Sequence, residues 1–209
     1  MGIIETLQAE IQSLKERVTA LEQRAKGSDD KIFRTTPERK EAARARVQAQ
    51  RQKTRDDIIE MAKRDVAELR MSARQNLLRA RFVVNREKRT VVCLLERFDL
   101  GYIKSRGIAK CHPDDCFNAH IGRAIALRRA LGLEVPEAYL NAPQPTEVRV
   151  GDVVKSKINE NPKYKICGVC GDYVDVIEVS FEIPYLNRPK NIFYVVDDSR
   201  EDAEQEVWR

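Results

Sequence analysis

Apolar residues recur at alternating intervals of three and four near the start of the chain, and this spacing predicts a coiled coil. The seam consists of Ile4, Leu7, Ile11, Leu14, Val18 and Leu21. Its a positions are β-branched and its d positions are leucine, a choice that favours two parallel strands. We therefore expect residues 1–26 to form the oligomerisation helix of a parallel homodimer. The alternative is an amphipathic helix that folds back onto its own domain.

A second, longer helix is predicted after a break at "KGSDD". Residues 27–35 form a linker, Thr36 is a natural N-cap, and Pro37 suits the first helical position. No glycine or further proline follows before about Arg81, so the helix is expected to reach that point. The second half has an apolar face made by Ile59, Ala62, Val66, Leu69, Ala73, Leu77 and Ala80. The half from Thr36 to Asp57 lacks one, and it should project into solvent or meet a partner.

The pattern then changes from helical to strand-like. The runs "RFVVN", "RTVVCLLER" and "YIKSRGIAKC", separated by "REK" and "FDLG", predict a three-stranded antiparallel meander. A helix follows from about Cys116 to Leu131, capped by Asp114 or Asp115 and closed by Gly132. Residues 36–132 thus have the order α-β-β-β-α.

The last third of the chain is rich in β-branched residues. Residues 133–146 contain several prolines and are expected to be a linker with one short turn. Residues 147–196 hold four strand-like runs with turns at Gly151 and Gly171-Asp172, which predicts a small barrel resembling the SH3 type. Residues 197–209 form an acidic tail. The fold class is therefore α+β.

The middle of the chain resembles a family of small bacterial domains of unknown function with the fold of double-stranded-RNA-binding domains. The resemblance covers residues 82–132 and is carried by Gly107, Ala109, Pro113, Asp115, Ile121, Gly122, Ala126, Arg129, Ala130 and Leu131. The whole chain is also similar to uncharacterised proteins of phages and prophages of Gram-positive bacteria. The resemblance implies the fold. RNA-binding members usually place lysines at the start of the last helix. This chain has Asp114, Asp115 and Asn118 there, and the two aspartates would repel phosphate.

Composition bears on where in the cell the protein is located. The chain is 42% hydrophobic and 34% charged, and its apolar runs are too short to span a bilayer. We expect no secretory leader, because "MGIIETLQAEIQ" lacks a basic region followed by an apolar one, and five cysteines are too few for a secreted disulfide scaffold. We expect a cytoplasmic protein without membrane contact, located in the host cytoplasm if a phage encodes it.

Charge is unevenly distributed and suggests a partner. Eight basic residues stand against two acidic ones between Arg34 and Arg55. This arm suits phosphates or an acidic protein surface. The candidate nucleic-acid contacts are Arg39, Lys40, Arg44, Arg46, Arg51, Lys53 and Arg55. Arg129 could instead be a structural partner for Asp114 or Asp115.

Candidate chemistry is sparse. A zinc site, if there is one, would use Cys116, His120, Cys167 and Cys170, but the chain has a single Cys-x-x-Cys pair and structural zinc often uses two. Cys116 and His120 are also spaced to meet on one helix face as a thiol and a base. Neither a complete catalytic motif nor a phosphate-cradling loop is present, and we expect no cofactor.

The sequence therefore favours a non-enzymatic, oligomeric nucleic-acid-binding protein of phage type whose basic arm contacts phosphates. The alternative is a structural or inhibitory phage protein whose small domains bind a host or phage protein.

Overall fold

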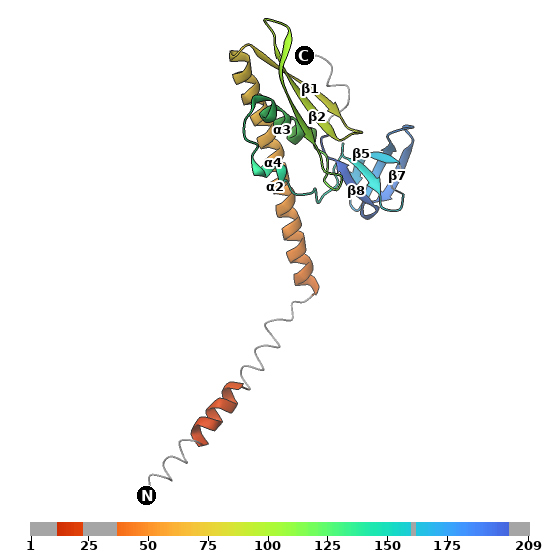
Figure 1. Cartoon of the computed structure of the whole chain (residues 1–209). Helices are drawn as coiled ribbons and strands as arrows, with labels where there is room; N and C mark the ends of the chain where they lie inside the picture. Colours follow the sequence, from red (N-terminus) through yellow and green to blue (C-terminus); the bar gives the residue numbers. More distant parts are fainter. Residues whose placement is uncertain (1–11, 23–36, 160–161, 201–209) are drawn as a thin grey trace, which may run out of the picture. The chain divides into compact units, whose positions relative to one another are not determined.

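The computed structural model describes residues 12–22, 37–159 and 162–200 and has the expected α+β composition. The chain divides into two compact units, Met1–Val47 and Gln48–Arg209 (Figure 1). Helix α2 (Pro37–Gln75) contributes residues to both. The seam positions Ile4, Leu7 and Ile11, the linker 27–35 and the cap Thr36 lie outside the described residues.

In the N-terminal unit, residues 12–22 are helical. The seam residues Leu14, Val18 and Leu21 are each more than half exposed on the single chain. Residues 37–47 of α2, which belong to the same unit, are exposed throughout. An apolar stripe is thus available on the described part of the first helix.

Helix α2 ends six residues before the predicted point, so the expectation of a helix to Arg81 was wrong. The backbone N–H of Leu77 donates to the carbonyl of Arg74 (3.0 Å), and Leu77 has a φ of 58°, which turns the chain out of the helix. Strand β1 (Leu78–Asn85) starts at the next residue. Ala80, assigned by its spacing to the helix face, enters the core from this strand instead.

Burial in α2 also begins earlier than predicted. The chain was expected to be solvent-facing or partner-facing as far as Asp57, but Gln52 and Arg55 are each 2% exposed. The Gln52 side chain accepts a hydrogen bond from the backbone N–H of Thr146 (2.8 Å). On the side of the helix that bears Gln52 and Arg55, the exposed half therefore ends at Arg51.

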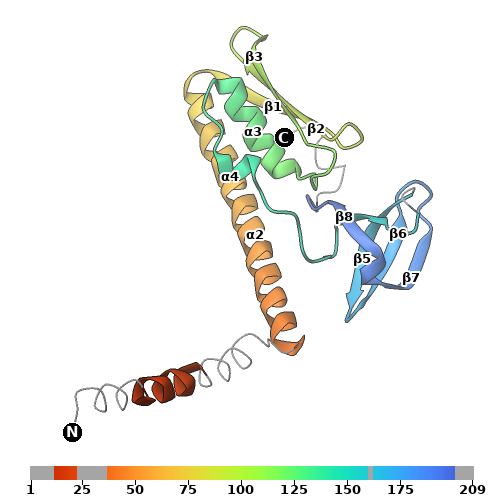
Figure 2. The ribbon, with the colours of Figure 1, turned by 60° about the horizontal axis from the view of Figure 1, so that its bottom comes forward.

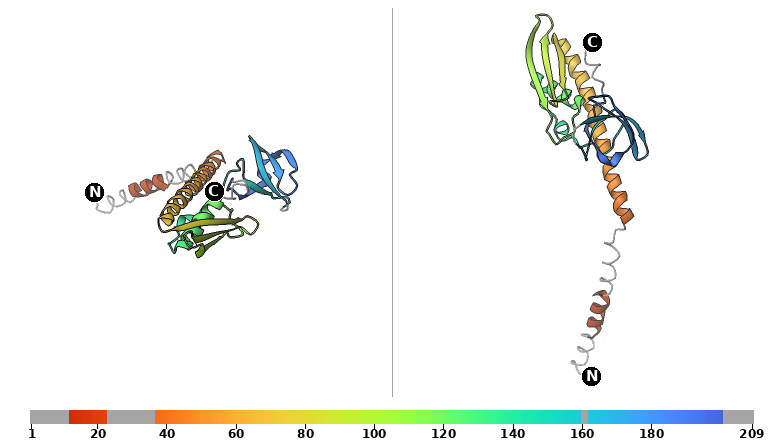
Figure 3. Two further views of the ribbon diagram at one scale, coloured as in Figure 1. Left: turned by 90° about the horizontal axis from the view of Figure 1, so that it is seen from above. Right: turned by 90° about the vertical axis from the view of Figure 1, so that its right-hand side faces the viewer.

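The predicted three-stranded meander is confirmed. Strands β1, β2 (Thr90–Arg97) and β3 (Tyr102–Lys110) pair antiparallel in the order β1-β2-β3. Helix α3 (Ala119–Leu131) covers one face of this sheet and lies between the sheet and α2 (Figures 2 and 3). Val91, Cys93 and Leu95 of β2 pack against α3 and form the main core.

The C-terminal end of α3 was predicted correctly, and its N-terminal end was not. Gly132 closes the helix in the left-handed conformation (φ 73°), as expected. The start at Cys116 with an aspartate cap is wrong, because the helix begins at Ala119 and Asn118 is its N-cap. The Asn118 side-chain oxygen accepts from the backbone N–H groups of His120 (3.0 Å) and Ile121 (3.1 Å).

The proline-rich segment 133–146 packs on the body of the C-terminal unit. Its short helix α4 (Glu137–Leu140) buries Tyr139 against Ile58 and Ala62 of α2 and Ile121 of α3. The Tyr139 hydroxyl donates to Asp65 (3.2 Å). The segment therefore contributes Tyr139 to the core, with Val135 and Ala142 partly buried beside it.

The C-terminal sheet contains five strands, one more than predicted. They are β4 (Val153–Ser156), β5 (Lys163–Cys170), β6 (Tyr173–Glu178), β7 (Pro184–Pro189) and β8 (Phe193–Asp197), with a 3-10 turn η1 (Lys190–Ile192) before the last. Their order is β7-β6-β5-β4-β8. The predicted turn at Gly171-Asp172 joins β5 to β6, and Gly171 has a φ of 55°.

Candidate functional site

The basic residues of α2 form a continuous exposed face. Six of the seven predicted contacts are exposed: Arg39, Lys40, Arg44, Arg46, Arg51 and Lys53. At 3.6 residues per turn, spacings of four and seven keep side chains in one row along a helix. Lys40, Arg44 and Arg51 make one such row, and Arg39, Arg46 and Lys53 make a second.

The acidic residues of this segment lie on the other side of the helix. Glu38 and Glu41 fall outside the half of the circumference that holds both basic rows. Ala43, Val47 and Gln50 separate the two rows, so the basic half has no acidic residue between its cations. The face is therefore a surface of one sign, suited to a polyanion.

Arg55, the seventh predicted contact, is not part of this face, and its assignment to phosphate is corrected. It follows Arg51 by one turn, in the part of α2 where burial has already begun at Gln52. Its Nε lies 2.6 Å from Oδ2 of Asp198, and its Nη2 lies 2.8 Å from Oδ1 of the same carboxylate. Its Nη1 donates to the carbonyl of Pro143 (2.6 Å). With 2% of its surface exposed, Arg55 has a structural role.

Asp198 belongs to a segment that joins several elements. Residues Asp197–Arg200, which we call the C-terminal clamp, directly follow or end β8. The side chain of Asn118 donates to Asp198 (2.9 Å), and the backbone N–H of Ala119 donates to Ser199 Oγ (2.7 Å). Asp197 accepts from Arg86 in the β1–β2 turn (2.7 Å). The predicted acidic tail therefore starts with two buried carboxylates, and residues 201–209 lie outside the described ones.

Three ionisable groups in or beside the clamp, Asp198, Arg55 and Asp152, have shifted pKa values. Burial alone would raise the pKa of Asp198, but the hydrogen bond and charge of Arg55 outweigh it, and the pKa lies below its ordinary value. Burial would likewise lower the pKa of Arg55, and Asp198 reverses this effect. Asp152 accepts from Arg200 Nε (2.8 Å), yet its burial prevails and raises its pKa.

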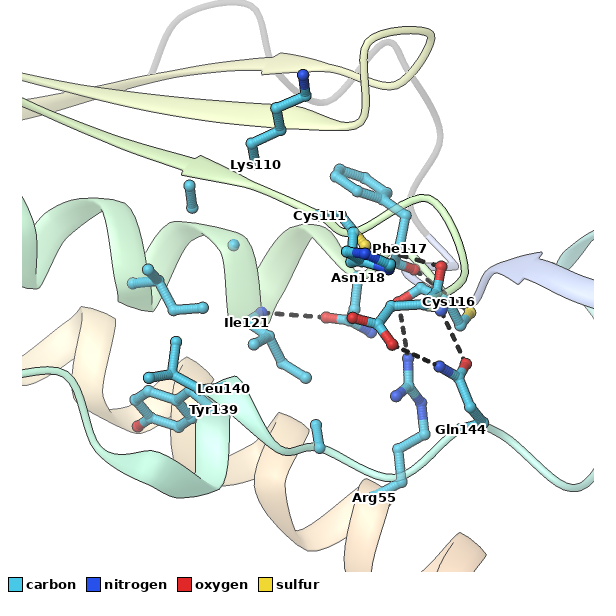
Figure 4. A pocket seen from close by; sticks show the side chains of 16 residues that line it. Arg55, Lys110, Cys111, Cys116, Phe117, Asn118, Ile121, Tyr139, Leu140 and Gln144 are labelled. Carbon is cyan, nitrogen blue, oxygen red and sulfur yellow. Dashed lines mark hydrogen bonds between the residues drawn. The ribbon is translucent and has the colours of Figure 1, made fainter.

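A cavity of about 200 Å³ lies beside the Arg55 side chain (Figure 4). One wall is apolar and includes Ile121, Ile125 and Leu140. The opposite wall is polar, and Gln144 closes it by accepting from the Cys116 backbone N–H (2.8 Å) and donating to Asp115 Oδ1 (2.9 Å). These polar groups hold the loop before α3 in place through hydrogen bonds within the protein.

The thiols at this cavity are in their protonated form at neutral pH. Burial raises the pKa of Cys116 strongly, and it also raises that of Cys111 although Arg89 Nη2 lies 3.3 Å from Cys111 Sγ. A protonated thiol is a weak nucleophile and a weak metal ligand. Cys116 also precedes α3, so the helical spacing to His120 considered from the sequence does not apply.

The candidate zinc ligands are dispersed over separate elements. Cys116 is buried before α3, His120 lies in its first turn, and Cys167 and Cys170 are exposed on β5. Within residues 12–22, 37–159 and 162–200, no group of three or more His, Cys, Asp or Glu side chains is arranged to hold a metal ion.

The start of α3 offers little to phosphate. Asp114 and Asp115 are exposed, and Asn118 is used as the cap. Arg128 is ion-paired with Asp65 (2.6 Å), and Arg129 donates to the carbonyl of Ile108 (2.6 Å) rather than to Asp114 or Asp115. The aspartates belong to a loop held by Arg89, which donates to the carbonyls of Pro113 and Asp115.

Sequence reasoning did not find Asp198, Gln144 or Arg86. They contact residues far away in the chain, and no local spacing marks them.

No protein-family model matches the chain, and comparison with curated proteins and with solved structures gives no match. In the part of the chain that the structure describes, no helix combines the length and apolar character needed to cross a bilayer.

Proposed function

We propose that the chain is a phage-type protein that binds nucleic acid through the basic face of α2. The observation that carries this proposal is the arrangement of six exposed cations on one half of the helix, with Glu38 and Glu41 on the other half. Phosphate contacts of this kind release counterions and give affinity without sequence preference. The protein acts by binding, without a catalytic step.

Dimerisation would multiply this affinity. The exposed Leu14, Val18 and Leu21 support a parallel coiled coil in which Ile4, Leu7 and Ile11 complete the seam. In such a pair Glu10 faces Lys15 of the second copy and Arg17 faces its Glu22, both attractive contacts. Once one basic face of the dimer has bound a nucleic acid, the second face is held near the same molecule at a high effective concentration, which strengthens binding.

The finer fold assignments also belong to this proposal. The order of α2, β1–β3 and α3, with both helices on one side of the sheet, supports a domain of the double-stranded-RNA-binding type. In the second sheet the first strand, β4, pairs with the last, β8, which supports a small SH3-like barrel. The phosphate-binding surface that we propose lies on α2 and differs from the one at the start of α3 used by that domain type.

The proposal is tested by titrating fluorescently labelled duplex DNA, duplex RNA and single strands with the full chain at low and moderate salt. The face variant Lys40→Ala/Arg44→Ala/Arg51→Ala should bind more weakly than the unaltered chain. The control variant Lys63→Ala/Arg64→Ala/Arg70→Ala removes three exposed cations from the same helix and should bind normally. Absence of binding at low salt would rule the proposal out.

A second candidate function is the binding of a host or phage protein. Phe181 and Leu186, beside and within β7, are 75% and 69% exposed. Val179 and Ile183 are exposed near them in sequence. Clustered exposed apolar residues are typical of protein interfaces. Copurification of one stoichiometric protein, without nucleic acid, would favour this function.

A further inference from the structure

The meander has an open face whose centre is apolar. Helix α3 covers one side of β1–β3, and the other side carries the residues that alternate with the core. Val83 is paired with Val92, and Val92 is paired with Ile108, so the three side chains form a row across the sheet. Val83 is 50% exposed and Ile108 is 46% exposed. This row is an apolar strip that the described residues leave open to solvent.

Cations border the apolar row on both sides. In the next row, Arg81 and Arg106 flank Leu94, and in the row on the other side Lys110 is paired with Thr90. The nearest acidic residue on this face is Glu96, whose carboxylate lies 3.3 Å from Arg81 Nε. The open face is therefore basic with an apolar centre.

This combination fits an acidic peptide segment with an apolar end. Single-stranded nucleic acid prefers aromatic side chains on which bases stack, and the central row contains only aliphatic ones. Phe82, the aromatic residue of β1, packs into the core on the opposite side. A peptide can match both features by placing carboxylates on the arginines and one large apolar side chain on the row.

The chain itself contains such a segment immediately after the described residues. Residues 201–209 read "EDAEQEVWR", with four acidic residues followed by Val207 and Trp208. Their charge is opposite to that of the open face. Trp208 supplies the large apolar side chain that the row lacks.

The segment also starts close enough to reach this face. Asp197 contacts Arg86 at the β1–β2 turn (2.7 Å), three residues before Arg200. Val83 lies three residues from Arg86, a distance of about 10 Å along a strand. Trp208 is the eighth residue after Arg200, and eight residues can span up to about 28 Å, so Trp208 can reach the row without any movement of the clamp.

We propose that residues 201–209 bind the open face of β1–β3 within the same chain. Their carboxylates contact Arg81, Arg106 and Lys110, and Trp208 covers Val83, Val92 and Ile108. The contact neutralises the basic charge of the sheet and leaves the basic face of α2 as the surface for phosphates. This inference does not depend on nucleic-acid binding.

Trp208 is the single tryptophan of the chain, so its fluorescence reports on the contact directly. In the full chain its emission should be blue-shifted and protected from acrylamide. The variant Ile108→Asp, on an exposed position, should shift the emission to the red and remove the protection. Arg81→Glu/Arg106→Glu should do the same by charge alone. Val169→Asp on β5 is the matched control, because Val169 is 40% exposed, and it should change nothing.

Far-UV circular dichroism establishes that each variant is folded, and the emission of the unaltered chain should not change on dilution. Trp208 emission typical of full exposure in the unaltered chain would overturn the proposal. Equal quenching in Ile108→Asp and Val169→Asp would also overturn it. If Ile108→Asp weakens nucleic-acid binding but leaves Trp208 unchanged, the open face is a nucleic-acid surface and the proposal is wrong. Emission that depends on protein concentration would overturn the placement within one chain.

Discussion

The guanidinium of Arg55 and the carboxylate of Asp198 form a buried, two-pronged ion pair between residues 143 positions apart, with N–O distances of 2.6 and 2.8 Å. The pair connects α2 to the residue after β8, the last strand. Asn118 and the carbonyls of Pro143 and Cys116 also hydrogen-bond to the pair. Strand β8 is thereby tied to helix α2.

Removal of the carboxylate should destabilise the protein strongly. Asp198→Ala leaves the Arg55 charge buried without its partner, which costs about 3–5 kcal/mol in the free energy of unfolding. Urea denaturation measures the loss. Glu60→Ala breaks an exposed ion pair with Lys63 and should change little. Equal losses in the two variants would show that the Arg55–Asp198 pair is not a stabilising contact.

The same pair predicts a dependence of stability on pH. Because the pKa of Asp198 is lowered in the folded protein, its ionised form favours folding. The contribution is present above the unfolded-state pKa of about 3.9 and is lost as the pH falls through the lower folded-state value. The difference in unfolding free energy between the unaltered chain and Asp198→Asn should therefore shrink at acid pH.

The dependence of stability on pH that we expect from Asp152 has the opposite sign. Burial raises its pKa, so its contribution is present below about pH 3.9 and is lost as the pH rises through the folded-state value. Relative to the unaltered chain, Asp152→Asn should gain stability as the pH rises from about 3.9 through the folded-state pKa of Asp152, and the difference should level off above it. Parallel pH profiles for the two asparagine variants would contradict both assignments.

Two glycines test the contacts of α3 with the sheet, Gly107 at β3 and Gly122 at β2. A Cβ on Gly107 would lie 2.5 Å from the backbone nitrogen of Ala130 and would also collide with the carbonyl of Ala126. Backbone cannot yield as a side chain can, so Gly107→Ala should cost about 3 kcal/mol, the upper end of the usual overpacking range. On α3, a Cβ on Gly122 meets the side chain of Val91 at 2.6 Å, and the clash is offset by about 1 kcal/mol of helix propensity. Thermal denaturation should thus rank Gly107→Ala well below Gly122→Ala.

The five cysteines should differ in reactivity. Burial raises the pKa of Cys93 to about 12 and strongly raises that of Cys116, whereas Cys167 and Cys170 are exposed. Ellman's reagent should modify the two exposed thiols first, and Cys93 and Cys116 only after denaturation. Cys167→Ser/Cys170→Ser should lose the fast phase. Rapid labelling of Cys116 in the folded protein would contradict its placement.

Features with a local physical cause were predictable from the sequence. The meander follows from alternation and short turns, and Gly132 ends α3 because glycine adopts the left-handed conformation at low cost. The end of α2 has no such local signal. Leu77 and Ala80 continue the helical period, but residues 78–85 pair with β2 instead, and tertiary contacts decide between the two structures. Strand β7 was missed because prolines stand at both of its ends.

The candidate site shows the same limit. In sequence, Arg55 is indistinguishable from Arg51 one turn before it. The difference comes from Asp198, whose position beside α2 depends on the complete fold. Net charge therefore predicted a basic face, and the fold determined which arginine was excluded from it.

The central claim, that the basic face of α2 holds phosphates, is tested most directly by the salt dependence of DNA affinity. For duplex DNA, a plot of the logarithm of the binding constant against the logarithm of the salt concentration has a negative slope. Its magnitude decreases by about 0.9 for each phosphate contact removed. The account predicts a shallower slope for Lys40→Ala/Arg44→Ala/Arg51→Ala and an unchanged slope for Lys63→Ala/Arg64→Ala/Arg70→Ala. Identical slopes for both variants and the unaltered chain would contradict it.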